Sequence, residues 1–215
     1  MGFYNFLNGC PSLEHSSQSE KLNKSNQRKD QILQALAAML EHPQQTKITI
    51  KALATQSGVS ESSIYRCFAC KPQMFEALII FIEKTLFVLI NNILHEEHCG
   101  KKKIEKLLLL LLGFSQKNRG ITRILICDAL INENEYLQSR INKLHNRLEA
   151  TLKQALRFAI SEQKMNVNFD VSAQANLFMC FVIGRWYQFV KSEFQDDPLR
   201  NWQAQRLVLL PLAFH

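Results

Sequence analysis

The stretch ITIKALATQSGVSESSIYRCF, residues 48–68, decides the fold. Apolar residues flank Gly58 at helical spacing. They are Leu53, Ala54, Val59, Ile64 and Phe68. Gly58 lies between the two segments, where a residue that tolerates φ > 0 turns the chain at little cost. Ser60 follows in the N-cap position of the second segment. The stretch therefore predicts two short amphipathic helices joined by a turn, a helix-turn-helix.

The second helix of this motif presents polar side chains outward. They are Glu61, Ser62, Ser63, Tyr65 and Arg66. Two helices packed in an ordinary all-α protein would show the same apolar spacing. The distribution of charge distinguishes that interpretation from a DNA-binding motif. Residues 21–71 hold eight Lys or Arg against three Asp or Glu, whereas residues 72–215 hold 18 against 14. This excess of positive charge around the motif favours contact with DNA phosphates.

The remainder of the 215-residue chain predicts an all-α protein. Gly and Pro number only seven and five, and apolar residues recur at steps of three and four. Residues 1–25 are expected to form a disordered extension, residues 26–71 the helix-turn-helix domain, and residues 72–215 a helical domain for dimerisation and partner binding. Helices are predicted over 30–41, 72–95, 101–117, 121–130, 134–164, 170–194 and 202–212, with coiled-coil-like packing over 134–164.

The apolar surface of residues 170–194 is wider than one face of a monomer needs. Together with residues 202–212, this segment is predicted to dock on a second copy of the chain as a symmetric dimer. Such a dimer would hold two DNA-reading helices at a fixed spacing.

The pI near 9.2 indicates an acidic partner, either nucleic acid or an anionic membrane surface. The leucine run 107–112 has only six residues between polar flanks, and a span needs about 20. No membrane contact is therefore expected. The first 20 residues lack the features of a signal peptide, and the six cysteines show no framework spacing, so a cytoplasmic chain with reduced thiols is expected.

Two groups of residues have types and spacing that metal sites also use. His95, His98 and Cys99 lie within one helical turn, and Cys67 and Cys70 have CxxC spacing. The two groups are about 25 residues apart and fit no zinc pattern, so neither a metal nor another cofactor is expected. No nucleophile, base and orienting acid are grouped, so the chain is not expected to be an enzyme.

Other apolar positions are assigned to the core. The leucine run could line a pocket for a small-molecule effector, but its large aliphatic side chains favour solid core, and no effector is expected. Cys127 and Cys180 lie in apolar stretches and are expected to be small core residues.

GVSESSIYRCF followed by CKPQMF resembles the end of the DNA-binding domain of TetR-type regulators. KLLLLLLGFSQKN, ITRIL, LQSRINKLHNRLEATLKQALR and FVKSEF are further similar to the nucleoid occlusion factors of that class, over residues 27–205. The resemblance implies a homodimer bound to chromosomal sites in the nucleoid. It also implies that this dimer binds the division protein FtsZ and inhibits assembly of the division ring. A ligand-responsive transcriptional repressor of the same fold is the alternative.

The resemblance and the chemistry of DNA together assign residue roles. Tyr65 and Lys71 match the family's phosphate contacts. The predicted phosphate-binding residues are Thr49, Lys51, Ser60, Tyr65 and Lys71. The predicted base-reading residues are Ser62, Ser63 and Arg66. The resemblance places the FtsZ-binding surface between the fourth and fifth helices, at Phe81, Leu110, Gly113, Lys117 and Asn118.

The chain departs from the family pattern at four positions. Cys67, Ala69 and Cys70 stand where the family has His, Pro and Ser, which bears on base preference. Leu89 stands where a basic residue is usual, which bears on the strength of FtsZ contact.

Overall fold

The computed structural model describes residues 17–42, 48–131, 133–163 and 170–210. Within these ranges all regular structure is helical, which confirms the all-α prediction. The helices are α1 (Ser17–Leu40), α2 (Ile50–Ser57), α3 (Glu61–Cys67), α4 (Lys71–Glu96), α5 (Gly100–Lys117), α6 (Arg119–Leu125), the short 3-10 helix η2 (Asp128–Leu130), α7 (Glu135–Gln163), α8 (Val171–Lys191) and α9 (Trp202–Leu209).

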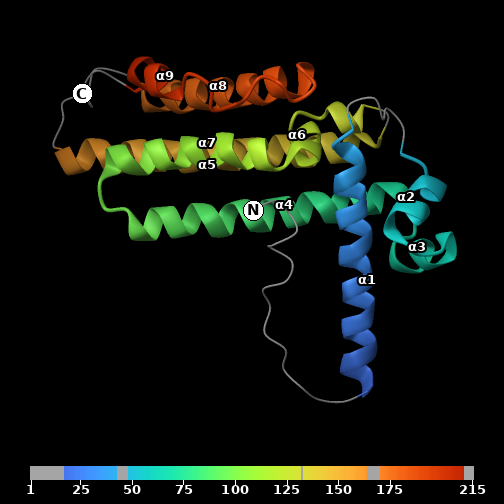
Figure 1. Cartoon of the computed structure of the whole chain (residues 1–215). Coiled ribbons are helices and arrows are strands. Elements are labelled where there is room, and N and C mark those ends of the chain that lie inside the picture. Colours follow the sequence, from blue (N-terminus) through green and yellow to red (C-terminus); the bar gives the residue numbers. More distant parts are fainter. Residues whose placement is uncertain (1–16, 43–47, 132, 164–169, 211–215) are drawn as a thin grey trace.

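The long helices are stacked in layers. Figure 1 shows α4, then α5 with α7, then α8 with α9, while α1 crosses near the beginning of α4 and α2 and α3 project at that end. The helix α1 packs against α2 and α3, and α7 packs against both α5 and α8. The molecule therefore presents the two short helices at one end of an elongated helical body.

The first helix begins earlier than predicted. Apolar periodicity predicts a start near residue 30, after an extension, whereas α1 begins at Ser17. Residues 17–29 contain neither Gly nor Pro and include Glu, Lys, Gln and Arg, which favour helix without needing an apolar face. The helix α1 thus includes residues 17–25 of the predicted extension, and residues 1–16 lie outside the described ranges.

Close packing between α1 and α6 fixes the helix-turn-helix to the body. A Cβ added at Gly120 would lie 2.2 Å from the carbonyl oxygen of Ala37, so only glycine allows this approach. One turn later, the guanidinium of Arg123 donates to the carbonyl oxygens of Leu40 (3.3 Å) and His42 (3.2 Å) at the end of α1. These bonds satisfy carbonyls that a helix end leaves without intrahelical partners.

Two carboxylates organise the beginning of α5. Glu97 accepts hydrogen bonds from the backbone N–H groups of His98 and Cys99, each 3.0 Å long, and pairs with Lys106 at 2.7 Å. These bonds lower the pKa of Glu97 to about 2, and the hydrogen bond from Lys106 has the largest effect. Glu162 accepts from the N–H of Gly100 at 2.7 Å. Anions at this end of a helix are stabilised by its dipole, which offsets the lysines at 101–103.

A row of contacts joins α4 to α7. The contacts, in order along the chain, are Lys71 with Glu133, which lies just before α7, then Glu76 with Tyr136, Glu83 with Arg140, and Phe87 with Arg147. We call these four contacts rungs. The residue order shows that α4 and α7 run parallel. The position of α4, which leads directly from the helix-turn-helix, is thus set by the second domain along several turns.

The segment predicted as one helix over 121–130 is broken. Cys127 has φ 63°, in the left-handed region, and separates α6 from η2. Cys127 is half-buried rather than fully buried. Cys180 is exposed, so the expectation that it is a core residue is wrong. Since α8 is apolar on most of its surface, its sequence does not tell which side faces the core.

The helices α8 and α9 are joined by a well-bonded connection. The guanidinium of Arg185 donates to the carbonyl oxygens of Asp197 (2.6 Å), Pro198 (3.2 Å) and Arg200 (3.2 Å). Trp186, fully buried, donates from Nε1 to the carbonyl oxygen of Leu111 at 3.1 Å. The first set of bonds fixes α9 relative to α8, and the second fixes α8 on α5.

The apolar composition of α4 has an explanation in its packing. Among the helices described, α4 alone has the length and mean hydropathy of a membrane span. Eight of its residues are buried, starting with Met74 and Phe75 and ending with Ile90. A helix that contributes to the cores of both domains needs this many apolar side chains.

The half-buried side chain of His145 predicts acid sensitivity. Its Nε2 atom is buried and has no hydrogen-bond partner within the described ranges. Burial lowers the pKa of His145 below its ordinary 6.5, against a smaller opposing effect of a hydrogen bond with the backbone of Leu125. As pH falls through about 6.5, the unfolded chain therefore binds a proton that the folded chain does not. Stability present above pH 6.5 is lost below it.

We expect His145→Phe to reduce the fall in melting temperature between pH 7 and pH 5. Each unit of pKa difference between the folded and unfolded states corresponds to about 1.4 kcal/mol. His98→Gln, at an exposed position, is the control and should leave the acid-induced fall unchanged. An equal fall in all three proteins would contradict this assignment.

Candidate nucleic-acid interface

The first short helix is positioned by its caps. The hydroxyl oxygen of Thr49 accepts a hydrogen bond from the backbone N–H of Ala52 at 3.2 Å. Gly58 ends the helix with φ 66°, in the left-handed conformation that its lack of a Cβ permits. Thr49 and Lys51 are exposed at the beginning of α2. Both side chains therefore lie on the surface of the motif.

Three serines form a hydroxyl cluster at the beginning of α3. Ser60 is the N-cap, and its Oγ accepts from the backbone N–H of Ser63 at 3.2 Å. The same Oγ lies 3.0 Å from the hydroxyl of Ser62 and 2.9 Å from that of Ser63. Ser60 thus has a structural role in addition to any contact with a phosphate, because its hydroxyl already satisfies an amide of the helix end.

The remainder of α3 separates an inner face from an outer face. Ile64 is fully buried and Phe68 is 6% exposed, as predicted for the inward positions. Tyr65 is 53% exposed, and Arg66 is also exposed. The helix therefore offers an aromatic hydroxyl and a guanidinium to the exterior, with the serine cluster one turn before them.

Lys71 differs from the other predicted DNA-binding residues. It is the first residue of α4, and its Nζ forms an ion pair with the Glu133 carboxylate, in the segment before α7. Its side chain is 26% exposed and that of Glu133 is 11% exposed. The Nζ atom also lies 5.6 Å from the ring centroid of Phe75. The phosphate contact predicted for Lys71 would thus involve an ammonium that already has an anionic neighbour.

The structure brings most of the predicted DNA-binding residues to one small unit. Seven of the eight lie on α2, on α3 or at their N-caps, and Lys71 follows four residues after α3 ends. Sequence reasoning missed Glu133, which is 62 residues away from Lys71 in the chain. No local pattern around residue 133 could have indicated that contact.

The residues assigned to FtsZ binding lie on α4, on α5 and just after α5. The two helices form an antiparallel hairpin (Figure 1), so Phe81 is level with the last turns of α5. Lys117 is exposed, and Phe81, Leu110 and Gly113 are half-buried. Asn118 donates from Nδ2 to the carbonyl oxygen of Phe114 at 2.8 Å, which makes it part of the α5 C-terminus.

Three large apolar side chains on the same two helices were not singled out from the sequence. Ile80 and Val88 on α4 are each 48% exposed, and Leu109 on α5 is 38% exposed. Apolar residues occur on nearly all sides of both helices, so the sequence alone did not show which of them face outward. They extend the apolar character of the exposed sides of α4 and α5.

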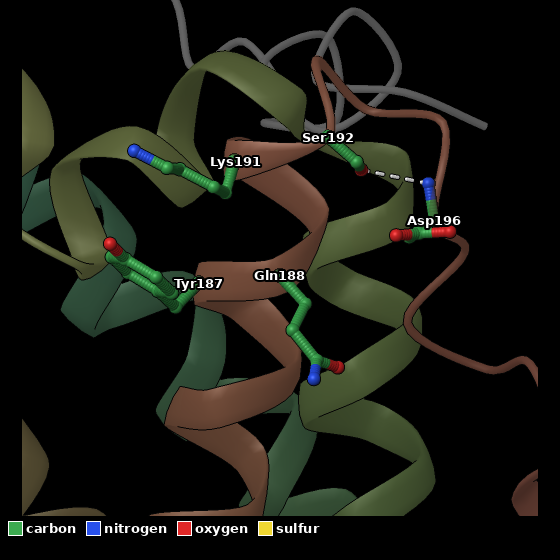
Figure 2. A pocket seen from close by; sticks show the side chains of 5 residues that line it. All are labelled: Tyr187, Gln188, Lys191, Ser192 and Asp196. Carbon is green, nitrogen blue, oxygen red and sulfur yellow. Dashed lines mark hydrogen bonds between the residues drawn. The ribbon is translucent and has the colours of Figure 1, made fainter.

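The outer sides of α8 and α9 carry a separate stripe. Its members are exposed: Ala173, Leu177, Cys180, Gly184, Tyr187 and Lys191 on α8, with Ala204, Leu207 and Val208 on α9. The steps along α8 are three and four residues, which place its six members on one side of the helix. Figure 2 shows Tyr187 and Lys191 projecting from that side of α8. We call these nine residues the α8–α9 stripe.

The stripe is separate from the apolar side chains that α8 buries in its own chain. Ala175, Phe178, Met179, Val182, Trp186 and Phe189 are all buried within the single chain. Leu177 on α8 and Val208 on α9, in contrast, are 49% and 86% exposed. The exposed apolar side chains of α8 and α9 are therefore different from those that the core of the single chain buries.

The residues considered for metal binding are not gathered into a site. His95 and His98 are exposed at the end of α4 and in the turn after it. Across the described ranges, no group of three or more His, Cys, Asp or Glu side chains is placed to hold a metal ion.

The fold is that of TetR-type transcriptional regulators. A TetR transcription regulator from Haloarcula marismortui has a TM-score of 0.71 at 17% identity, over 86% of this chain and 95% of that one. FadR from Bacillus subtilis, solved in complex with stearoyl-CoA, has a TM-score of 0.69 at 15% identity, over 86% of this chain and 98% of that one. Residues 100–211 match the family model of the SlmA-like, tetracyclin repressor-like C-terminal domain. This class comprises DNA-binding regulators rather than enzymes, as the sequence analysis expected.

Closer relatives identify the family within this class. The nucleoid occlusion factor SlmA of Marinomonas sp. is 44% identical over 187 residues, 87% of this chain and 95% of its own. The nucleoid occlusion factor SlmA of Alteromonas mediterranea is 44% identical over 182 residues, which cover 85% of this chain and 93% of that protein. The chain belongs to the SlmA family of nucleoid occlusion factors, which confirms the resemblance found in its motifs.

Proposed function

We propose that this protein binds chromosomal DNA as a homodimer in the cytoplasm and, when bound there, captures FtsZ and inhibits assembly of the division ring over the nucleoid. The observation that carries the proposal is the 44% identity to a nucleoid occlusion factor over 87% of the chain. That similarity includes the second domain as well as the helix-turn-helix.

The proposed DNA contacts follow from the chemistry of α2 and α3. Thr49, Lys51, Ser60, Tyr65 and Lys71 bond phosphate oxygens and set the register on the duplex. Ser62, Ser63 and Arg66 approach base edges. Arg66 is the strongest candidate for direct reading, because a guanidinium can donate two hydrogen bonds to guanine. Short serine hydroxyls discriminate weakly, so DNA shape and bridging water supply part of the specificity.

The proposed dimer is formed through the α8–α9 stripe. Leu177 and Val208 are large apolar side chains that a second copy would remove from water. Gly184 lies in the middle of the stripe, and a Cβ there would meet nothing within 4 Å in the single chain. A glycine with open space before it allows two helices to approach closely. Two copies related by a two-fold axis would then present two α3 helices to one duplex.

The proposed FtsZ surface is the α4–α5 hairpin at Phe81, Leu110, Gly113, Lys117 and Asn118. Two features support it: Lys117 is exposed, and Ile80 and Leu109 add exposed apolar area to the same helices. An apolar surface with a cation at its edge suits a short segment that carries both apolar and acidic side chains.

Co-sedimentation with assembled FtsZ tests the proposal. The protein is sedimented with FtsZ polymers with and without specific duplex DNA, and the same is done for Phe81→Ala and Lys117→Glu. We expect duplex DNA to increase retention of the unmodified protein, and each substitution to weaken retention about tenfold while DNA binding persists. Lys102→Glu is the control, because it reverses an exposed charge on the same helix, near its opposite end.

Equal retention of every variant would exclude this surface. A ligand-responsive repressor of the same fold, the alternative function, would retain no FtsZ and would release its DNA when an effector is added.

A further inference from the structure

The ion pair between Lys71 and Glu133 connects the proposed DNA contact with the second domain. Lys71 opens α4 directly after the helix-turn-helix, whereas Glu133 lies between η2 and α7. The backbone N–H of Glu133 donates to the carbonyl oxygen of Leu130 at 3.0 Å, which anchors the residue beside η2. We infer that Glu133 acts as an intramolecular competitor of DNA phosphate for the ammonium of Lys71. This inference rests on the proposed DNA contact of Lys71.

The ion pair between Lys71 and Glu133 differs from the next two rungs in which side supplies the acidic group. In the next two rungs, α4 supplies the acid, Glu76 or Glu83, and α7 supplies the donor. At Lys71 the cation belongs to α4 and the carboxylate to the other domain. Among the rungs described, this is the one whose α4 member is also a proposed phosphate ligand.

Burial makes the competition effective. The side chain of Glu133 is only 11% exposed, so little water is available to its carboxylate if the ammonium turns away. An ammonium has three donors and can bond a carboxylate and a phosphate together, but the two anions then repel across it. In both cases, a hydrogen bond from the Lys71 ammonium to a phosphate weakens the ion pair between Lys71 and Glu133.

Two consequences follow for DNA binding. The Lys71 contact contributes less to affinity for any duplex than an unpaired lysine would, and it releases less counterion. Because Glu133 belongs to the second domain, the phosphate contact is also coupled to the packing of α4 on α7. Glu133 is thus a positioning residue that tunes the electrostatic part of binding from outside the DNA-binding domain.

Glu133→Gln tests the inference, because glutamine keeps the shape and a hydrogen-bond acceptor but removes the charge. We expect this variant to bind duplex DNA of any sequence about threefold to tenfold more tightly per protomer at low salt. The slope of log K against log salt should steepen by up to about one unit per protomer. Glu135→Gln is the matched control, since Glu135 is exposed two residues away and loses the same charge.

Lys71→Ala separates the inference from the function on which it rests. We expect Lys71→Ala to weaken binding to all duplexes and flatten the salt dependence, and Lys71→Ala combined with Glu133→Gln to bind as Lys71→Ala alone does. If Lys71→Ala weakens binding but Glu133→Gln fails to strengthen it, or strengthens it no more than Glu135→Gln does, the competition is overturned. If Lys71→Ala leaves binding unchanged, the DNA contact itself is overturned, and the inference with it.

Discussion

Gly184→Glu is expected to convert the dimer to a monomer and to weaken DNA binding about a hundredfold or more. Gly184 is exposed at the middle of the α8–α9 stripe, so a glutamate there places a charged side chain where a second copy would approach. Losing the dimer makes each α3 bind its half-site alone, without the effective concentration that the linked second site provides. Analytical ultracentrifugation and a DNA titration measure the two effects.

The folded monomer should tolerate this substitution. A Cβ at Gly184 meets nothing within 4 Å, and glutamate favours helix over glycine by up to about 1 kcal/mol. Gln154→Glu, at an exposed position on α7, adds the same charge outside the stripe and should remain dimeric. A dimeric Gly184→Glu protein with unchanged affinity would show that the copies associate through another surface.

Gly120→Ala is expected to destabilise the protein and to weaken DNA binding at the same time. The added Cβ would lie 2.2 Å from the Ala37 carbonyl oxygen and 3.0 Å from the Glu41 backbone nitrogen, so α1 has to move. Overpacking of this kind costs about 1 to 3 kcal/mol, more than the gain from replacing a helical glycine. For a chain of this size, the melting temperature should fall by roughly 2 to 10 °C.

Gly113→Ala provides the comparison, because a Cβ at Gly113 meets nothing within 4 Å. That variant should be as stable as the unmodified protein or more stable, by up to about 1 kcal/mol. If Gly120→Ala were stabilising to the same extent, α1 and α6 could not be packed as closely as described.

The local parts of the fold were predictable because their signals act over a few residues. Thr49, Gly58 and Ser60 specify where α2 begins, where it ends and where α3 begins, through bonds that span three or four positions. The inward positions of α3, Ile64 and Phe68, followed from helical periodicity in the same way. These signals identify the motif without any knowledge of the second domain.

The features that could not be predicted from the sequence depend on contacts that no short stretch of residues reveals. The partner of Lys71 is 62 residues away, so nothing near either residue indicates the pair. The break between α6 and η2 falls on Cys127, which is neither Gly nor Pro. The exposure of Cys180 was also missed, because α8 is apolar on most of its surface and its sequence does not tell which side faces the core.

The hydrogen bonds of Arg185 bear on how easily two chains would associate. Because its guanidinium holds three carbonyl oxygens of the α8–α9 connection, the two helices keep their mutual orientation before any partner arrives. Association then immobilises few additional torsions, and less conformational entropy is lost at the encounter. Such preorganisation would let a modest contact area sustain a lasting pair at low cellular concentrations.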